Sequence, residues 1–277
     1  MEKATDRAIH VHELRLHYLD WGGGGDKIIL LLHGFMGHAR VWDDLALALC
    51  ARYRVLALDQ RGHGDSEWSK DASYGMDRHF TDLSRFIDSL GVQKIMLVGH
   101  SMGGRNALFY TACVPEKVER LVLVDARLGN SPEASVALRR QLASLPLEAK
   151  ALGEVVEALR SLYPYLPVKT CRHIAGHGYV KTRDGTFVPK YDARMSLQLE
   201  KAAYTTDDLW RMMQNVTCPT LLVRGEESPF VSREEARSTC AALPGARFQE
   251  IAGATHMPAQ ENPEAFKRAV LDFLDEP

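Results

Sequence analysis

Short apolar runs, each about the length of a β-strand, recur along the chain at spacings that leave room for a helix between them. Most of these runs are apolar at every position, which is typical of strands covered on both faces of a sheet. Strands are predicted at Lys27–Leu32, Arg54–Leu58, Ile95–Val98, Leu121–Val124, Pro219–Val223 and Arg247–Ile251. Alternating residues at Ala8–His12 and Leu14–Leu19 predict an additional N-terminal hairpin.

The segments between these strands carry apolar residues at helical spacing. Val41, Leu45 and Leu49 recur every four residues. A second apolar stripe, Phe80–Leu90, ends at Gly91, a residue type favoured just after a helix. Further helices are predicted over Ala107–Cys113, after the capping pair Ser232 and Glu235, and from Asn262-Pro263 onward.

This alternation predicts an α/β fold with a mostly parallel central sheet flanked by helices. In such sheets, functional residues gather at the carboxyl ends of the strands. His33, Asp59, Ser101 and Asp125 all stand just past a predicted strand. We therefore expect these four residues to lie along one edge of the sheet.

The alternation stops between residues 129 and 216. Helical patterns appear there around Ser135–Ser144, Leu147–Tyr163 and Ser196–Asn215, and Tyr179–Tyr191 predicts a small hairpin turning at Asp184-Gly185. No strand of the sheet-core type is evident in this stretch. The predicted organisation is a core of residues 1–128 and 217–277, with residues 129–216 inserted as a mainly helical cap.

Composition and charge exclude several classes of protein. The chain has 277 residues with a formal charge of −2, so it lacks the basic surplus of a nucleic-acid-binding protein. A polar N-terminus and the lack of a long apolar run argue against a signal peptide and a membrane span. The 5 cysteines have no paired spacing, which favours free thiols in the cytoplasm over disulfides, and the histidines show no zinc-like spacing.

The most informative motif is Gly99-His100-Ser101-Met102-Gly103, a G-x-S-x-G sequence between a predicted strand and a predicted helix. Glycines on both sides of the serine allow a tight turn that exposes its hydroxyl. The Met102 amide, at the start of the helix, would then point to where an oxyanion forms. The alternative is a glycine-rich strand-to-helix turn with an incidental serine.

The order of these motifs resembles the α/β-hydrolase superfamily. The matching residues are His33-Gly-Phe35, Arg61-Gly-His-Gly64, the Ser101 motif, the strand-end Asp125 and the late His256. The resemblance implies that Ser101 is the nucleophile, His256 the base, and the Phe35 and Met102 amides the oxyanion hole. It also implies that His33, Gly34 and His100 line the pocket.

The acid of the implied triad has two possible positions. In the superfamily it often follows the strand after the cap, but the matching position here is Ser228, with Glu226 and Glu227 beside it. A second placement, at the end of the strand after the nucleophile helix, falls on Asp125. Asp125 is the favoured acid, and Glu226 and Glu227 are the alternatives.

The expected activity is hydrolysis of a small-molecule carboxylic ester or thioester through an acyl-enzyme, without a cofactor or a metal. Lactone opening and carbon–carbon bond hydrolysis use the same serine chemistry and stay open as alternatives. A serine at the elbow argues against epoxide hydrolases and haloalkane dehalogenases, which use a carboxylate nucleophile there. A non-catalytic binding protein with the same fold is the alternative from another class. The natural substrate and the oligomeric state are left open.

Overall fold

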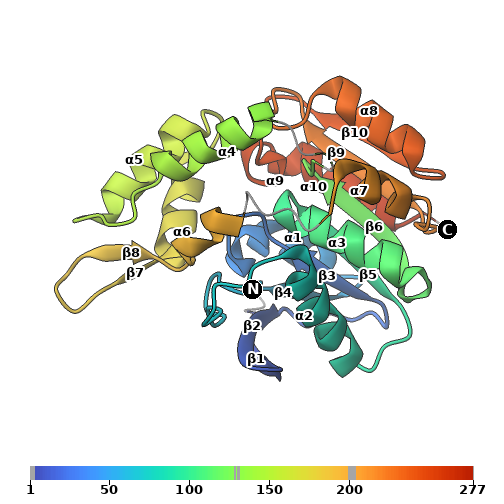
Figure 1. Ribbon diagram of the computed structural model, residues 1–277, viewed down its shortest axis with the longest axis horizontal. Helices are drawn as coiled ribbons and strands as arrows, with labels where there is room; N and C mark the ends of the chain where they lie inside the picture. Colours follow the sequence, from blue (N-terminus) through green and yellow to red (C-terminus); the bar gives the residue numbers. More distant parts are fainter. Residues whose placement is uncertain (1–3, 128, 130–131, 199–203, 277) are drawn as a thin grey trace.

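The computed structural model describes residues 4–127, 129, 132–198 and 204–276 of the chain (Figure 1). An eight-stranded sheet forms its centre, in the order β1-β2-β4-β3-β5-β6-β9-β10. Strands β3 to β10 of this sheet run parallel, while β2 is antiparallel to both β1 and β4. The strands are β1 Thr5–Val11, β2 Leu14–Asp20, β3 Ile28–Leu32, β4 Arg54–Leu58, β5 Ile95–His100, β6 Val118–Val124, β9 Thr220–Gly225 and β10 Arg247–Ile251.

Helices cover both faces of this sheet. On one face lie α2 (Met76–Ser89), α3 (Met102–Cys113), α7 (Thr206–Met213) and α8 (Arg233–Ala242). On the other lie the 3₁₀ turn Ala39–Trp42, α1 (Asp43–Leu49) and α10 (Pro263–Leu274). Two short elements complete the core: a 3₁₀ turn at Pro115–Lys117 and α9 at Pro258–Glu261.

Successive residues of the central strands feed two separate hydrophobic cores. In β3, Leu30 and Leu32 pack with α2 and α3, whereas Ile29 and Leu31 pack with α1 and α10. All five residues of β3 are buried. Because side chains alternate between the faces of a strand, a strand covered on both faces must be apolar throughout, as the sequence indicated.

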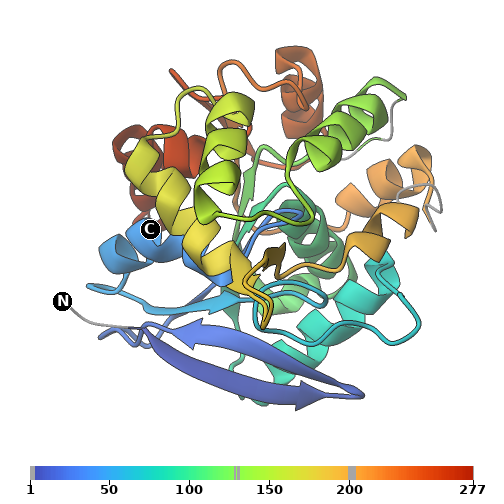
Figure 2. The ribbon, with the colours of Figure 1, turned by 90° about the vertical axis from the view of Figure 1, so that its left-hand side faces the viewer.

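Most of the inserted segment forms a separate layer beside the sheet. Figure 1 shows this layer on the left of the sheet, and Figure 2 shows it after the molecule is turned by 90°. It contains α4 (Pro132–Ser144), α5 (Leu152–Leu162), α6 (Val168–Gly178), the hairpin β7 (Tyr179–Lys181) and β8 (Phe187–Pro189), and a 3₁₀ turn at Ala193–Gln198. Its own core packs Val155, Leu159 and Cys171 together with Met257 of the main body. The last helix, α7, instead packs on α3, and Met213 at its end belongs to the sheet core.

The predicted strands, the N-terminal hairpin and the Tyr179–Tyr191 hairpin are confirmed. The caps at Ser232 and Asn262 are also confirmed, because both side chains accept a hydrogen bond from a backbone amide of the helix that follows. Helix α6 was not predicted. All five cysteines are free thiols. Within the described residues, no helix combines the length and the apolar character needed to cross a bilayer.

Candidate active site

Ser101 sits in a strained turn between β5 and α3. Its backbone has φ of 50° and ψ of −113°, conformations that L-residues rarely adopt outside functional sites. A Cβ on Gly99 would lie 2.4 Å from the Gly103 carbonyl oxygen, and one on Gly103 would lie 2.4 Å from that of Leu32. The two glycines therefore let α3 approach the sheet closely enough to hold this turn. The Ser101 amide donates to the Val124 carbonyl (2.8 Å), which ties the turn to β6.

Asp125 and His256 meet beside this turn, although 131 positions separate them in the sequence. His256 Nδ1 donates to Asp125 Oδ2 over 2.7 Å, and both side chains are buried. Asp125 directly follows β6 and also has positive φ, at 44°. Its amide donates to the Val223 carbonyl (2.7 Å), so the parallel pairing of β6 and β9 sets its position. No hydrogen bond joins the Ser101 hydroxyl to His256 in the described chain; this contact commonly shortens only with substrate bound.

Ser228, which occupies the more usual position of the acid, contacts the same carboxylate. Its hydroxyl accepts from the amides of Phe230 (3.2 Å) and Val231 (3.1 Å). With its lone pairs so engaged, the hydroxyl donates its proton to Asp125 Oδ2 (2.6 Å). Ser228 therefore holds the Asp125 carboxylate in place.

The two alternative acids point elsewhere. Glu226 and Glu227 are both exposed, and neither contacts His256 among the hydrogen bonds of the described residues. Glu227 instead accepts a hydrogen bond from the hydroxyl of Tyr165, in the inserted segment (2.5 Å). Of the carboxylates proposed from the sequence, Asp125 is the one that the structure brings to the imidazole.

Three further residues hold the His256 loop, and the sequence analysis gave none of them this role. The rings of His100 and Phe230 contact the His256 ring, at centroid distances of 4.6 and 4.3 Å. His100 Nε2–H donates to the His256 carbonyl (2.7 Å). Buried Glu261 accepts from the amides of Thr255 (2.7 Å) and Met257 (3.1 Å), on either side of the histidine. A carboxylate on the short helix α9 gave no sequence signal, because its partners lie in an irregular loop.

The loop after β3 lies against the Ser101 turn. A Cβ on Gly34 would lie 2.6 Å from His100 Nδ1 and 3.3 Å from the Cβ of Ser101, so a larger residue does not fit there. This close approach brings the Phe35 backbone to the start of α3, where the Met102 amide has no acceptor within its own helix. Both residues are partly exposed. The arrangement can offer two N–H donors to an oxyanion.

His33 and His100 have a structural role in the walls of the site and not a chemical one. His33 Nδ1–H donates to the Gly34 carbonyl (2.7 Å), while its Nε2 accepts from the Gln60 amide (3.0 Å). Burial lowers the pKa of His33, and it lowers that of His100 further below the usual range. Both rings are therefore neutral and fixed by backbone contacts.

A second histidine–carboxylate pair lies away from Ser101. His17 Nδ1 donates to Asp59 Oδ2 (2.7 Å), but its Nε2 is engaged with Asp6 (3.1 Å), so the ring has no nitrogen free to act as a base. Burial raises the pKa of Asp59, but the hydrogen bond from His17 and other contacts outweigh it and bring the pKa to about 2.

Together with Asp65, this pair is the one group of possible metal ligands found among the described residues, with ligand atoms within 4.8 Å. Its atoms already have partners. Asp59 Oδ1 accepts from the Ala39 amide (2.6 Å), and Asp65 pairs with Lys190 (2.7 Å). The cluster fastens the loop after β4.

Known proteins resemble this chain along almost its whole length. A 2-(acetamidomethylene)succinate hydrolase from Mesorhizobium japonicum is 29% identical over 269 residues, covering 97% of this chain and 95% of that protein. A 2-hydroxy-6-oxononadienedioate/2-hydroxy-6-oxononatrienedioate hydrolase from Klebsiella pneumoniae is 26% identical over 294 residues, covering 99% and 96%. The crystal structure of an E-2-(acetamidomethylene)succinate hydrolase matches with a TM-score of 0.89 at 29% identity, covering 99% of this chain and 100% of that one. The model of the alpha/beta hydrolase family matches residues 29–269, and the chain therefore belongs to this family.

Proposed function

We propose that the chain is a serine hydrolase that cleaves a carboxylic ester or thioester through an acyl-enzyme on Ser101. The observation that carries the proposal is the 2.7 Å contact between His256 and Asp125, beside a serine in a strained elbow. A serine hydroxyl is a weak nucleophile at neutral pH and needs such a positioned base. The fold alone would not justify the proposal, because the same fold also serves other functions.

In the proposed reaction, the Ser101 hydroxyl attacks the substrate carbonyl while His256 Nε2 takes its proton. Asp125 holds the ring with Nε2 towards the serine and stabilises the imidazolium that forms. The Phe35 and Met102 amides donate to the tetrahedral oxyanion. His256 then returns the proton to the leaving group. A water, deprotonated by the same ring, then attacks the acyl-enzyme, and the ring returns that proton to the Ser101 oxygen as the acid is released.

A second candidate reaction is cleavage of an amide or a carbon–carbon bond. The names of the two relatives favour it, because one substrate carries an acetamido group and the other is an oxo-dienedioate. The same nucleophile, base and oxyanion donors serve these bonds, so the site geometry is compatible with all of them. Lactone opening is a further possibility of the same kind.

We also propose that residues 129–216 act as a cap over Ser101, on a core of residues 1–128 and 217–277, with the exception of α7, which packs on α3 of the core. Contacts with loops at the carboxyl ends of the strands support this arrangement. Tyr165 donates to Glu227 after β9, and the Asp192 amide donates to the Gly62 carbonyl after β4 (2.9 Å). The free cysteines support a reducing compartment, and we propose the cytoplasm.

Labelling with a fluorophosphonate probe tests the proposal, because the probe reacts with an activated serine and not with an ordinary one. We expect stoichiometric labelling of the wild type, complete loss in Ser101→Ala, and no loss in Ser196→Ala, which removes a serine hydroxyl of the inserted segment. A wild-type protein that is folded but not labelled would favour a non-catalytic binding protein. Rates on p-nitrophenyl esters, thioesters, lactones, N-acyl enamines and vinylogous diketones would then identify the bond that is cleaved.

A further inference from the structure

A tight turn follows β3 and contains Phe35, one of the two proposed oxyanion donors. The Gly37 amide donates to the Gly34 carbonyl (3.0 Å) and closes the turn over Phe35 and Met36. Met36 has φ of 61°, in the left-handed region that costs free energy for a residue with a Cβ. A residue keeps such a conformation where the structure around it holds it there.

His63 provides this support from the loop after β4. Its Nε2 accepts from the Met36 amide (3.2 Å), and its Nδ1–H donates to the Arg61 carbonyl (3.0 Å). The ring is buried and makes edge-to-face contacts with the rings of His33 and Phe35, at centroid distances of 4.9 and 5.8 Å. Burial holds the pKa of His63 well below its usual range, so the ring is neutral and Nε2 keeps the lone pair that accepts the amide.

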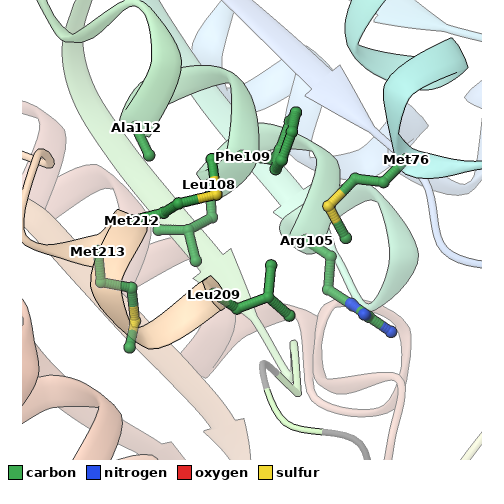
Figure 3. A pocket seen from close by; sticks show the side chains of 8 residues that line it. All are labelled: Met76, Arg105, Leu108, Phe109, Ala112, Leu209, Met212 and Met213. Carbon is green, nitrogen blue, oxygen red and sulfur yellow. The ribbon is translucent and has the colours of Figure 1, made fainter. Parts of the chain in front are cut away.

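The other end of the turn is held through His33. Its Nδ1–H donates to the Gly34 carbonyl, and its own carbonyl accepts from the side-chain amide of Gln60 (2.7 Å). Asn106 on α3 donates in turn to Gln60 Oε1 (2.7 Å). Arg105, the residue before it, instead lines a narrow pocket between α3, α7 and the start of α2, whose other lining residues are apolar (Figure 3). Buried hydrogen bonds thus join the turn after β3, the loop after β4 and helix α3.

These contacts fix the direction in which the Phe35 amide points. In a trans peptide, the C=O and the N–H point in opposite directions. The Gly34 carbonyl faces His33 Nδ1 and the Gly37 amide, so the Phe35 N–H of the same peptide points away from both, and no hydrogen bond between backbone groups of the described residues uses it. Gly34 itself lies against the nucleophile, since its added Cβ would be 3.3 Å from the Cβ of Ser101. The Phe35 N–H is therefore available beside Ser101.

We propose that His63 is a positioning residue of the oxyanion hole: its ring accepts the Met36 amide and thereby holds the turn that presents the Phe35 amide. The proposal rests on the function proposed above and gives the histidine of the Arg61-Gly-His-Gly64 motif a part in that reaction. An oxyanion exists in the transition state and not in the bound substrate. A displaced donor therefore lowers kcat and leaves KM little changed.

Two amide variants of His63 differ in where they place a hydrogen-bond acceptor. The side-chain oxygen of His63→Gln reaches about as far as Nε2 and can accept the Met36 amide, whereas the shorter His63→Asn ends near the position of Nδ1. We expect His63→Asn to lower kcat on the best ester by about tenfold or more, with KM changed less than about threefold, since loss of a whole oxyanion donor costs about 10²–10³-fold. His63→Gln should keep about a third of kcat or more. His79→Asn, at another buried histidine, is the matched control and should change kcat by less than about twofold.

Hydrogen exchange of the Met36 amide, followed by NMR, tests the contact without turnover. In Ser101→Ala we expect this amide to be protected, to exchange about tenfold faster or more when His63→Asn is added, and to stay protected when His63→Gln is added. Turnover by the wild type with an unchanged kcat in folded His63→Asn would overturn the positioning role and leave the hydrolase standing. Without turnover by the wild type, protection lost in His63→Asn and kept in His63→Gln would refute the hydrolase and uphold His63 as the residue that holds the turn. Should His63→Asn fail to fold, His63→Leu takes its place, because leucine fills a buried site and offers no acceptor.

Discussion

Asp125 Oδ2 receives two hydrogen bonds, from His256 Nδ1 and from the Ser228 hydroxyl. In the sequence, these residues belong to three separate segments. The neighbouring residues in the sequence do not distinguish Asp125 from an ordinary turn residue. They also do not show that Ser228, which stands where the acid is usual, contacts the acid. Their relationship depends on strand pairing, because the register of β6 and β9 places the Asp125 amide on the Val223 carbonyl. That is why the sequence predicted the serine and the histidine directly but left Glu226 and Glu227 as alternatives for the acid.

Replacing Asp125 by asparagine should abolish most of the turnover while leaving the fold intact. An asparagine amide in this position would donate to His256 Nδ1, so the ring would carry its proton on Nε2 and could not accept one from Ser101. In a serine protease with a Ser-His-Asp triad this change costs about 10⁴-fold in kcat. We expect a loss of that order in steady-state assays on the best ester of the panel.

Glu227→Gln is the matched control for this substitution, because Glu227 is exposed and its described contact is with Tyr165. It should change kcat by less than about threefold, in line with the small effect expected of a surface hydrogen bond. Near-normal turnover of Asp125→Asn together with a large loss in Glu227→Gln would reassign the acid.

Among the elements, the strands were the easiest to predict. A strand buried on both faces, such as β3, must be apolar throughout, and that pattern is visible without any knowledge of its neighbours. Helix α6 was not predicted because just two of its residues, Cys171 and Ala175, are buried, so it shows little of an apolar stripe.

The elbow between β5 and α3 should tolerate no side chain at Gly103. An alanine Cβ there would lie 2.4 Å from the Leu32 carbonyl oxygen and 2.5 Å from that of His33, and these are backbone atoms that cannot move without shifting β3. We expect Gly103→Ala to lower the free energy of unfolding by about 1–3 kcal/mol or more, as overpacking does in other cores.

Gly153→Ala provides the comparison, since it also lies in a helix but has no atom within 4 Å of the added Cβ. It should be neutral or stabilising by up to about 1 kcal/mol, because alanine is the better helix former. Urea unfolding of both variants measures the difference. Equal stability of the two would mean that the strand and helix do not approach each other as closely as described.

For the molecule as a whole, the protonation of its histidines should set how stability depends on pH. Burial lowers the pKa of most of the histidines in the main body and at the cap contact, to about 4 for His38 and about 3 for His79. Those with a lowered pKa are His33, His38, His63, His79, His100 and His177. The unfolded chain binds protons at these positions near pH 6.5 while the folded chain does not, so acid favours unfolding.

Two histidines act in the opposite direction. Burial lowers the pKa of His17, but its hydrogen bonds to Asp59 and Asp6 and the charges of Asp59 and Asp65 together outweigh burial and raise it. The pKa of His173 is raised by its hydrogen bond to Asp43. Each contributes stability below pH 6.5 that is lost as the pH rises through its folded value. More histidines have a lowered pKa than a raised one. We therefore expect the free energy of unfolding to fall as the pH decreases from 6.5 to 4.5, a range that lies above the pKa of Asp59.

His79 allows this dependence to be measured one residue at a time. His79→Gln removes a group that takes up a proton on unfolding, so its stability should fall less steeply between pH 6.5 and 4.5, by at most about 1.4 kcal/mol per pH unit. Exposed His10 on β1 is the control, and His10→Gln should follow the wild-type slope. Urea unfolding at intervals of half a pH unit gives both slopes. A variant slope equal to that of the wild type would mean that His79 is protonated in the folded protein, which would contradict its burial as a neutral ring beside Arg61.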